Sequence, residues 1–335
     1  MSVGLMGFGR IGRNVFRLLA DEELDVGAIV DIAEPEALAY LLKYDSIYGR
    51  FDREVDLDGS VLTVAGSKIP IINAREPGEV DWAALGVSTV VQATGKYRTS
   101  DWCRRHLDRG ADRVILASTP ETPGDMPILL RGVNDEILTP ETDIIAMGSN
   151  TSNALAPLLQ ILDDAFGMER MYFTTVHAYT NKERLGDVPT DDFRSSRAAG
   201  ENIIPAHTNS PEIIAQVLPQ FAGRLSGMAL NVPVENGSTI DSVAVLTANV
   251  TAAEVNDTIR MATEERFAGI LGFTDDPIVS TDVRGSRCSG IFDSLATLVV
   301  GGSMLKTIVW FDNGWGYSVR VVETLRMIDG MKVRT

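Results

Sequence analysis

Cysteine is scarce in this sequence, and its scarcity excludes several kinds of protein. Only Cys103 and Cys288 occur among 335 residues. Two cysteines cannot form the disulfide framework of a small secreted domain or a cysteine-rich metal site, so we expect no metal. No basic region and long apolar stretch precede the strand-like run Val3-Gly4-Leu5-Met6, as they would in a signal peptide. We therefore expect a reducing, cytoplasmic location.

Positive charge and long hydrophobic runs are also lacking. The chain has 46 acidic and 30 basic residues, and its formal net charge is -16. This excess of negative charge repels phosphate backbones and anionic lipid surfaces, so neither nucleic acid nor a membrane is an expected partner. The most apolar later segment, 295–311, is interrupted by Gly301, Gly302 and Lys306, which favours paired strands over a membrane span.

A glycine-rich turn follows the first apolar run. It reads Gly7-Phe8-Gly9-Arg10-Ile11-Gly12 and leads into a helical pattern. Gly7 permits a tight turn, Gly9 lets the backbone approach a pyrophosphate, and Gly12 lets the helix pack closely on the strand. The helix N-terminus then holds the phosphates with its N–H groups and dipole. The alternative interpretation is an ordinary strand–helix turn without a ligand.

An acidic residue ends the next predicted strand. The run 26–30 leads to Asp31, where a carboxylate can accept hydrogen bonds from ribose hydroxyls. Its charge would repel a 2′-phosphate, so the order of elements predicts NAD as the cofactor. Asp31 could instead be a strand-end acid that faces water. Two further buried parallel strands, 89–95 and 114–118, place Thr94, Gly95 and Ser118 at the expected cofactor cleft.

The second half begins with a capped helix. Residues 143–147 read as the last strand of the first domain, and Ser149 can cap a helix that continues through Leu162. A chain of 335 residues, 44% of them hydrophobic, can bury two domain cores. We predict one domain over 1–149 plus 315–335 and a second over 150–314.

Several motifs in one order resemble the glyceraldehyde-3-phosphate dehydrogenase family, over nearly the whole chain. They are Gly7 to Gly12, Lys43-Tyr44-Asp45-Ser46, Ser149-Asn150-Thr151-Ser152-Asn153, Leu155-Ala156-Pro157, Thr175 to Thr180, Arg197 to Pro205, Val217-Leu218-Pro219 and Trp310 to Ser318. The resemblance implies an α/β fold. A Rossmann-type doubly wound sheet would be joined to a C-terminal α+β catalytic-type domain with a large mixed or antiparallel sheet.

The resemblance also implies roles for individual residues. The helix start at Asn150 is where the family carries its attacking thiol, and His177 would lie opposite it. Asn313 would hydrogen-bond the nicotinamide carboxamide. The segment 181–202 resembles a long family loop that packs at a subunit interface, and a homotetramer is therefore implied. A last helix is expected at roughly 317–327.

The chain departs from the family where the chemistry is done. Asn150 replaces the nucleophile, and an amide cannot attack an aldehyde as a thiolate does. Asn231 stands where the family has a phosphate-gripping arginine, Asn209 where it has a glycine, and Ser195 where it has another arginine. Four hydroxyl residues of the implied phosphate sites are retained: Ser149, Thr151, Thr180 and Thr208.

Three hypotheses follow from this mixture of retained and lost residues. In the first, the chain is an NAD-binding pseudoenzyme that senses a metabolite or assembles with another protein. In the second, it is an oxidoreductase in which His177 takes a proton from an aldehyde hydrate or alcohol without a covalent intermediate. In the third, it is an ordinary dehydrogenase whose cysteine was replaced by engineering. His177 could equally be a packing residue. Asn150 could orient a small-molecule carbonyl or merely fill space.

Overall fold

The computed structural model describes residues 1–22, 24–181 and 183–332. The chain divides into two compact units, each described by itself. Unit 1 consists of Met1–Leu129, Asn134–Gly148 and Ser318–Thr335, and unit 2 of Leu130–Val133 and Ser149–Tyr317. The predicted boundaries for independently folding domains stay a prediction.

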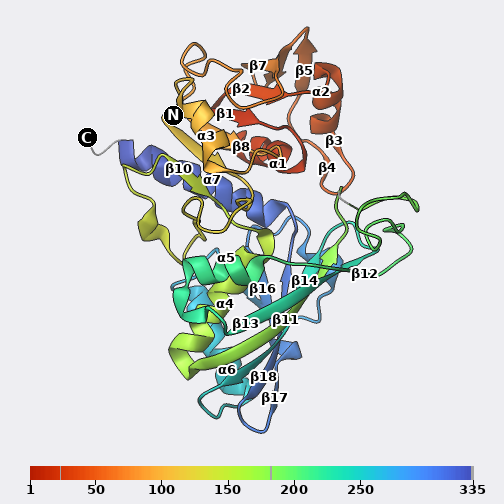
Figure 1. The fold of residues 1–335 in the computed structure, drawn as a ribbon, viewed down its shortest axis with the longest axis vertical. Coiled ribbons are helices and arrows are strands. Elements are labelled where there is room, and N and C mark those ends of the chain that lie inside the picture. The colour runs from red at the N-terminus through yellow and green to blue at the C-terminus, as the bar shows by residue number, and fades with distance from the viewer. Residues whose placement is uncertain (23, 182, 333–335) are drawn as a thin grey trace. The chain divides into compact units, whose positions relative to one another are not determined.

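The first unit is built on an eight-stranded sheet (Figure 1). Its order is β10-β9-β8-β1-β2-β7-β6-β5, parallel from β10 to β7 and antiparallel from β7 to β5. The strands are β1 Ser2–Met6, β2 Asp25–Asp31, β5 Val55–Asp58, β6 Val61–Val64, β7 Ser67–Asn73, β8 Thr89–Gln92, β9 Arg113–Leu116 and β10 Ile144–Ala146. The strands expected near 26–30, 89–95, 114–118 and 143–147 are therefore present.

Helices connect these strands, and the helix predicted after the glycine-rich turn is among them. They are α1 Arg10–Leu19, α2 Pro35–Lys43 and α3 Ser100–Leu107, with the 3-10 helix η1 Asp135–Ile137 and a small sheet of β3 Tyr44–Asp45 and β4 Gly49–Arg50. The last helix, α7 Trp315–Lys332, is longer than expected at both ends. It continues because buried apolar residues recur as far as Ile328.

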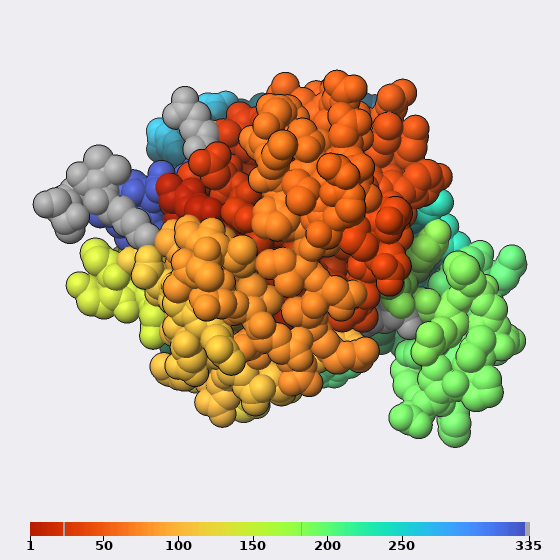
Figure 2. All heavy atoms as spheres, turned by 90° about the horizontal axis from the view of Figure 1, so that it is seen from above, coloured from red at the N-terminus to blue at the C-terminus, as the bar shows by residue number. Residues whose placement is uncertain are grey.

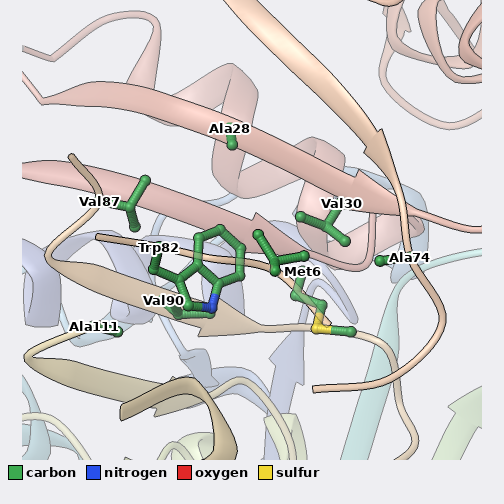
Figure 3. Packing of buried hydrophobic residues seen from close by; sticks show 9 residues of the cluster. Met6, Ala28, Val30, Ala74, Trp82, Val87, Val90 and Ala111 are labelled. Carbon is green, nitrogen blue, oxygen red and sulfur yellow. The ribbon is translucent and has the colours of Figure 1, made fainter. Parts of the chain in front are cut away.

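The core of unit 1 surrounds the indole of Trp82 (Figure 3). Met6, Val30 and Val90 come from three neighbouring strands and pack with it. Trp82 is fully buried, and its Nε1–H donates to Nδ1 of His106 at 3.0 Å. A buried indole N–H requires such a partner, because leaving it unpaired would be costly.

The second unit contains a mixed sheet, which confirms the predicted fold class. Its order is β12-β13-β11-β14-β18-β16-β15, with β17 paired to β18. The strands are β11 Met168–Ala178, β12 Ile204–Ala206, β13 Leu225–Val232, β14 Ser238–Leu246, β15 Leu271–Thr274, β16 Gly290–Asp293, β17 Leu298–Val300 and β18 Met304–Phe311. The antiparallel pair β17 and β18 accounts for the apolar segment predicted as paired strands.

Helix α4 organises the second unit. It spans Asn150–Phe166 and contacts β11, β14 and β16 as well as α5 Ser210–Val217 and α6 Ala252–Glu264. Ser149 caps it as predicted, in a reciprocal capping box with Ser152. The 3-10 helices of this unit are η2 Pro219–Phe221, η3 Ser280–Val283 and η4 Ser294–Ala296.

A long irregular segment follows β11. The described residues between β11 and β12, 179–181 and 183–203, form no helix or strand, apart from an isolated bridge between Arg184 and Ala198. They stand out as a green lobe in Figure 2. Within the described part of the chain, no helix is both long enough and apolar enough to cross a bilayer.

Candidate functional site

The glycine-rich turn joins β1 to α1 with a geometry that only small residues allow. Gly7 has φ +94°, and a Cβ there would lie 2.6 Å from the backbone N of Thr94. A Cβ on Gly12 would collide with the carbonyl oxygen of Gly7. Gly9 differs, because no atom lies within 4 Å of the position its Cβ would take. The backbone at Gly9 is therefore open to a ligand, directly before the N-terminus of α1.

A cavity of about 200 Å³ lies at the carboxyl ends of β1, β2 and β8. It is lined by Met6, Gly7, Gly9, Val30, Asp31, Ile32, Ala74, Arg75, Ala93, Thr94, Lys96 and Tyr97. It thus brings together four of the predicted cofactor residues: Gly7, Gly9, Asp31 and Thr94. The other six, Arg10, Ile11, Gly12, Gly95, Ser118 and Asn313, are not among the lining residues.

The carboxylate of Asp31 is held in a fixed orientation at the end of β2. Its Oδ2 accepts the N–H of Phe8 at 2.7 Å and its Oδ1 accepts the N–H of Ala33 at 3.0 Å. A carboxylate offers about four acceptor sites, so it can still accept a hydrogen bond from a ribose hydroxyl. This geometry fits a nucleotide with free ribose hydroxyls.

Three polar residues of the cavity wall were not predicted from the sequence. Lys96 and Tyr97 follow Gly95 directly, and Tyr97 has a left-handed backbone with φ 55°. Arg75 lies just beyond β7, a strand that the sequence pattern did not assign. A lysine directly after a glycine that follows a buried strand is the signal that could have indicated a phosphate-facing cation.

In unit 2, the side chain of Asn150 is tied on both sides. Its Nδ2 donates to the backbone oxygen of Asn313 at 2.9 Å, and its Oδ1 accepts the N–H of Thr151 at 2.8 Å. The amide therefore sits at the first turn of α4 as a linker between two backbone segments. It has no atom that could act as a nucleophile.

His177 lies near the end of β11 and contacts Asn313, the residue to whose backbone Asn150 donates. Nδ1 is 2.6 Å from the oxygen of Ala178, and Nδ2 of Asn313 is 3.2 Å from Nε2. A carbonyl oxygen can only accept, so Nδ1 is the donor to Ala178, and Nε2 is then the ring nitrogen that can accept from the Asn313 amide. Asn313 also donates to Oγ of Ser238 at 2.7 Å. The structure thus brings Asn150, His177 and Asn313 together.

The predicted phosphate residues fall into two clusters. In the first, Oγ of Ser149 is 3.3 Å from Oγ of Ser210, and Oγ1 of Thr208 donates to the same atom at 3.1 Å. These hydroxyls lie at the N-termini of α4 and α5. In the second, Thr180 and Asn231 both hydrogen-bond to Glu183, a residue that sequence reasoning missed.

The remaining predicted polar residues take local roles. The hydroxyl of Thr151 is 3.5 Å from Oδ1 of Asn150, and Asn209 is the exposed residue that precedes α5. Ser195 donates to Asp192 at 2.6 Å. Each of these positions carries a short polar side chain at a helix start or a turn, where such residues are common.

Cys103 does not have the character of a reactive thiol. Cys103 belongs to α3 in unit 1, and burial raises its pKa to about 12. At neutral pH it stays protonated, and a protonated thiol is a poor nucleophile. Cys288 is partly buried in unit 2.

A unit with a glycine-rich nucleotide turn, joined in sequence to a unit with a strand-borne histidine, defines an NAD-binding oxidoreductase. Residues 1–100 match "Glyceraldehyde 3-phosphate dehydrogenase, NAD binding domain", and residues 149–313 match "Glyceraldehyde 3-phosphate dehydrogenase, C-terminal domain". The chain is 44% identical over 325 residues to glyceraldehyde-3-phosphate dehydrogenase 1 of Bacillus subtilis, covering 96% of each chain. It is 43% identical over 325 residues to the enzyme of Geobacillus stearothermophilus, again covering 96% of each. It is 44% identical over 329 residues to that of Kitasatospora aureofaciens, covering 97% of this chain and 98% of the relative.

The chain therefore belongs to the glyceraldehyde-3-phosphate dehydrogenase family, as its motifs predict. Its cofactor is NAD, also as predicted. The residues of unit 1 fit this cofactor, since Gly9 leaves the backbone open and Asp31 faces the same cavity. The individual roles predicted for the site residues, including that of Asn313, stay predictions.

Proposed function

We propose that this chain binds NAD but does not carry out thiol-dependent phosphorylating oxidation, because Asn150 occupies the nucleophile position of the family. The observation that carries this proposal is the double anchoring of the Asn150 amide, on Asn313 and on Thr151. A carboxamide in such a position can hold a neighbouring segment, but it cannot form the covalent intermediate from which an acyl phosphate is released.

The function that remains is sensing or assembly. The surface of such a pseudoenzyme would change shape when NAD and a small metabolite bind, and another protein would recognise that change. We propose a cytoplasmic homotetramer, since the resemblance includes the long segment after β11. The expectation that nucleic acid and membranes are not partners is supported by the net charge of -16.

One observation favours a second function, that of an oxidoreductase without a covalent intermediate. The hydrogen bond from Nδ1 of His177 to the oxygen of Ala178 leaves Nε2 as the acceptor, and Nδ2 of Asn313 lies 3.2 Å from it. A substrate hydroxyl that displaced this amide could give its proton to Nε2. Bound NAD supplies the hydride acceptor for such a reaction. The chain's own contribution would be to orient the substrate and to hold the proton on Nε2.

A single experiment separates the two functions. The protein is incubated with NAD and with glyceraldehyde or glyceraldehyde 3-phosphate; NAD binding is measured by calorimetry, NADH by absorbance and covalent adducts by intact mass. We expect NAD binding, no acyl adduct and no NADH from the natural chain, and a covalent adduct from Asn150→Cys with at least one aldehyde.

The outcomes that would contradict each function are distinct. An acyl adduct on the natural chain, or a lack of NAD binding, would overturn the proposal. NADH formed without an adduct, and abolished by His177→Gln, would establish the second function instead. An Asn150→Cys variant that binds NAD and forms no adduct would show that more than the thiol has changed.

A further inference from the structure

We infer that Glu183 determines ligand specificity in unit 2: its carboxylate makes the site beside His177 select uncharged, hydroxyl-bearing ligands and reject phosphate-bearing ones. The inference rests on the proposed function only in assuming that a small ligand binds beside Asn150 and His177. It assigns a chemical class to that ligand.

The Glu183 side chain is held from both oxygens. Oε2 accepts the backbone N–H of Thr180 at 2.7 Å and its hydroxyl at 2.9 Å, and Oε1 accepts Nδ2 of Asn231 at 2.7 Å. Three donors therefore fix the carboxylate in one place. Asn231 lies 48 positions further along the chain, so the third contact ties the segment after β11 to the sheet.

The sheet register places this carboxylate next to His177. Strands β11 and β13 are parallel, and His177 pairs with Asn231. Paired residues on neighbouring strands point to the same face, and the strands are about 4.8 Å apart. The same register can be checked at Phe173 and its partner Gly227, where the phenyl ring lies 2.5 Å from the position of a Cβ on the glycine. Asn231 thus carries Glu183 to the face on which His177 meets Asn313.

The donors at this point are already engaged by the protein's own carboxylate. The Thr180 hydroxyl and the Asn231 amide could each donate to an anionic ligand, but both donate to Glu183. A phosphate that approached them would have to displace a like charge, which is unfavourable. A carboxylate with three of about four acceptor sites filled can still accept a hydroxyl hydrogen. The arrangement therefore suits a polyol or a hydroxyaldehyde.

Two probes that differ only by a phosphate test the inference. Glyceraldehyde and glyceraldehyde 3-phosphate are titrated by calorimetry into NAD-saturated protein and into its Glu183→Gln variant. We expect the natural chain to prefer the neutral probe by about tenfold or more, and Glu183→Gln to bind the phosphorylated probe about tenfold more tightly than the natural chain does. Binding of the neutral probe should change by less than about threefold.

Glu169→Gln is the matched control. Glu169 is an exposed residue near the opposite end of β11, eight positions from His177, or about 26 Å along a strand. The Glu169→Gln substitution removes the same charge as Glu183→Gln, but at a distance from His177, and it should leave both affinities unchanged. If Glu169→Gln raises the affinity for the phosphorylated probe as much as Glu183→Gln does, the effect comes from the net charge of the protein, and the inference is overturned.

Other outcomes are equally decisive. If Glu183→Gln binds the phosphorylated probe within about twofold of the natural chain, Glu183 is only a structural link and the inference falls. If neither probe binds either protein, the carboxylate selects nothing and the inference also falls. A separate titration of NAD into the same protein reports on the proposed function. Should Glu183→Gln not fold, salt replaces it: raising NaCl from about 0.05 to 0.5 M should narrow the preference of the natural chain by screening, and an unchanged preference overturns the inference.

Discussion

At the scale of the residue, Gly9 and Gly12 show how one residue type serves two purposes within a single turn. Gly12 is required by the fold, because a side chain there would meet the carbonyl oxygen of Gly7. Gly9 is not required by the fold, because the space around its Cβ position is open and its φ is −71°. A ligand is therefore the remaining physical reason for the glycine at position 9.

The Gly9→Ala substitution tests this reasoning. We expect the free energy of unfolding of the variant to lie within about 1 kcal/mol of that of the natural chain, since nothing in the protein is displaced. We expect its affinity for NAD to fall by about tenfold or more, because the added methyl group occupies the approach path of the pyrophosphate. Thermal unfolding and calorimetric titration with NAD measure the two effects.

Gly330→Ala is the control, because its Cβ position is also open, its φ is not left-handed and it lies in α7, outside the segment expected at the subunit interface. It should leave NAD affinity unchanged and shift the free energy of unfolding by no more than about 1 kcal/mol. Unaltered NAD affinity in Gly9→Ala would mean that the cofactor does not approach the backbone at this residue.

At the scale of the element, the sequence predicts what local patterns determine. Strand β1, the glycine turn and α1 are recovered because a short apolar run, three glycines and a helical period follow one another. The start of α4 is recovered because Ser149 is a good cap. The sequence pattern does not indicate β5 and β6, because each has only four residues and they are the last two strands at one edge of the sheet. It does not indicate β7 either, a seven-residue strand between β2 and β6 that is interrupted by Pro70.

The site was predictable in part for the same reason. Motif order indicated Asn150, His177 and Asn313, and the structure brings them together. It did not indicate Glu183, because the contact with Asn231 depends on how an irregular segment returns to the sheet. Motif order also did not indicate the buried hydrogen bonds from Trp82 to His106 and from His106 to Gln92, because these residues lie on separate elements and meet only after folding.

The buried hydrogen bonds that join Trp82, His106 and Gln92 predict that stability depends on pH. His106 lies in α3 with Nδ1 accepting from Trp82 and Nε2 3.0 Å from Oε1 of Gln92. Burial lowers its pKa from 6.5 to about 4. The unfolded chain therefore binds a proton between these values and the folded chain does not. Stability that is present above pH 6.5 is lost as the pH falls towards 4, by about 3 kcal/mol.

The His106→Gln variant lacks the titrating group. At pH 7 it should be less stable by about 2 kcal/mol, because the indole N–H of Trp82 loses its acceptor. As the pH falls from 7 to 4, the natural chain loses about 3 kcal/mol that the variant does not lose, so the difference in unfolding free energy should decrease and change sign. Urea unfolding at several pH values measures it, with exposed His207→Gln as the control. A difference that does not vary with pH would contradict the prediction.

At the scale of the whole molecule, composition and motif order together indicate the family, and the full-length similarity to its members confirms it. What composition does not indicate is how copies of the chain associate. Among the described residues between β11 and β12, four large apolar side chains are exposed: Leu185, Val188, Phe193 and Ile203. Leu185 is 90% exposed and Phe193 is 86% exposed. Large exposed apolar groups on one segment commonly mark a contact surface.

The proposed homotetramer therefore predicts that this segment is buried on assembly. Replacing Leu185 and Phe193 together by serine should convert the tetramer to smaller species, because the apolar area that drives association is removed while the fold of unit 2 does not depend on it. Light scattering coupled to size exclusion measures the mass. Met261→Ser, which changes a 57% exposed side chain on α6, is the control and should stay tetrameric. A double variant that remains tetrameric would place the interface elsewhere, and a monomeric natural chain would refute the tetramer itself.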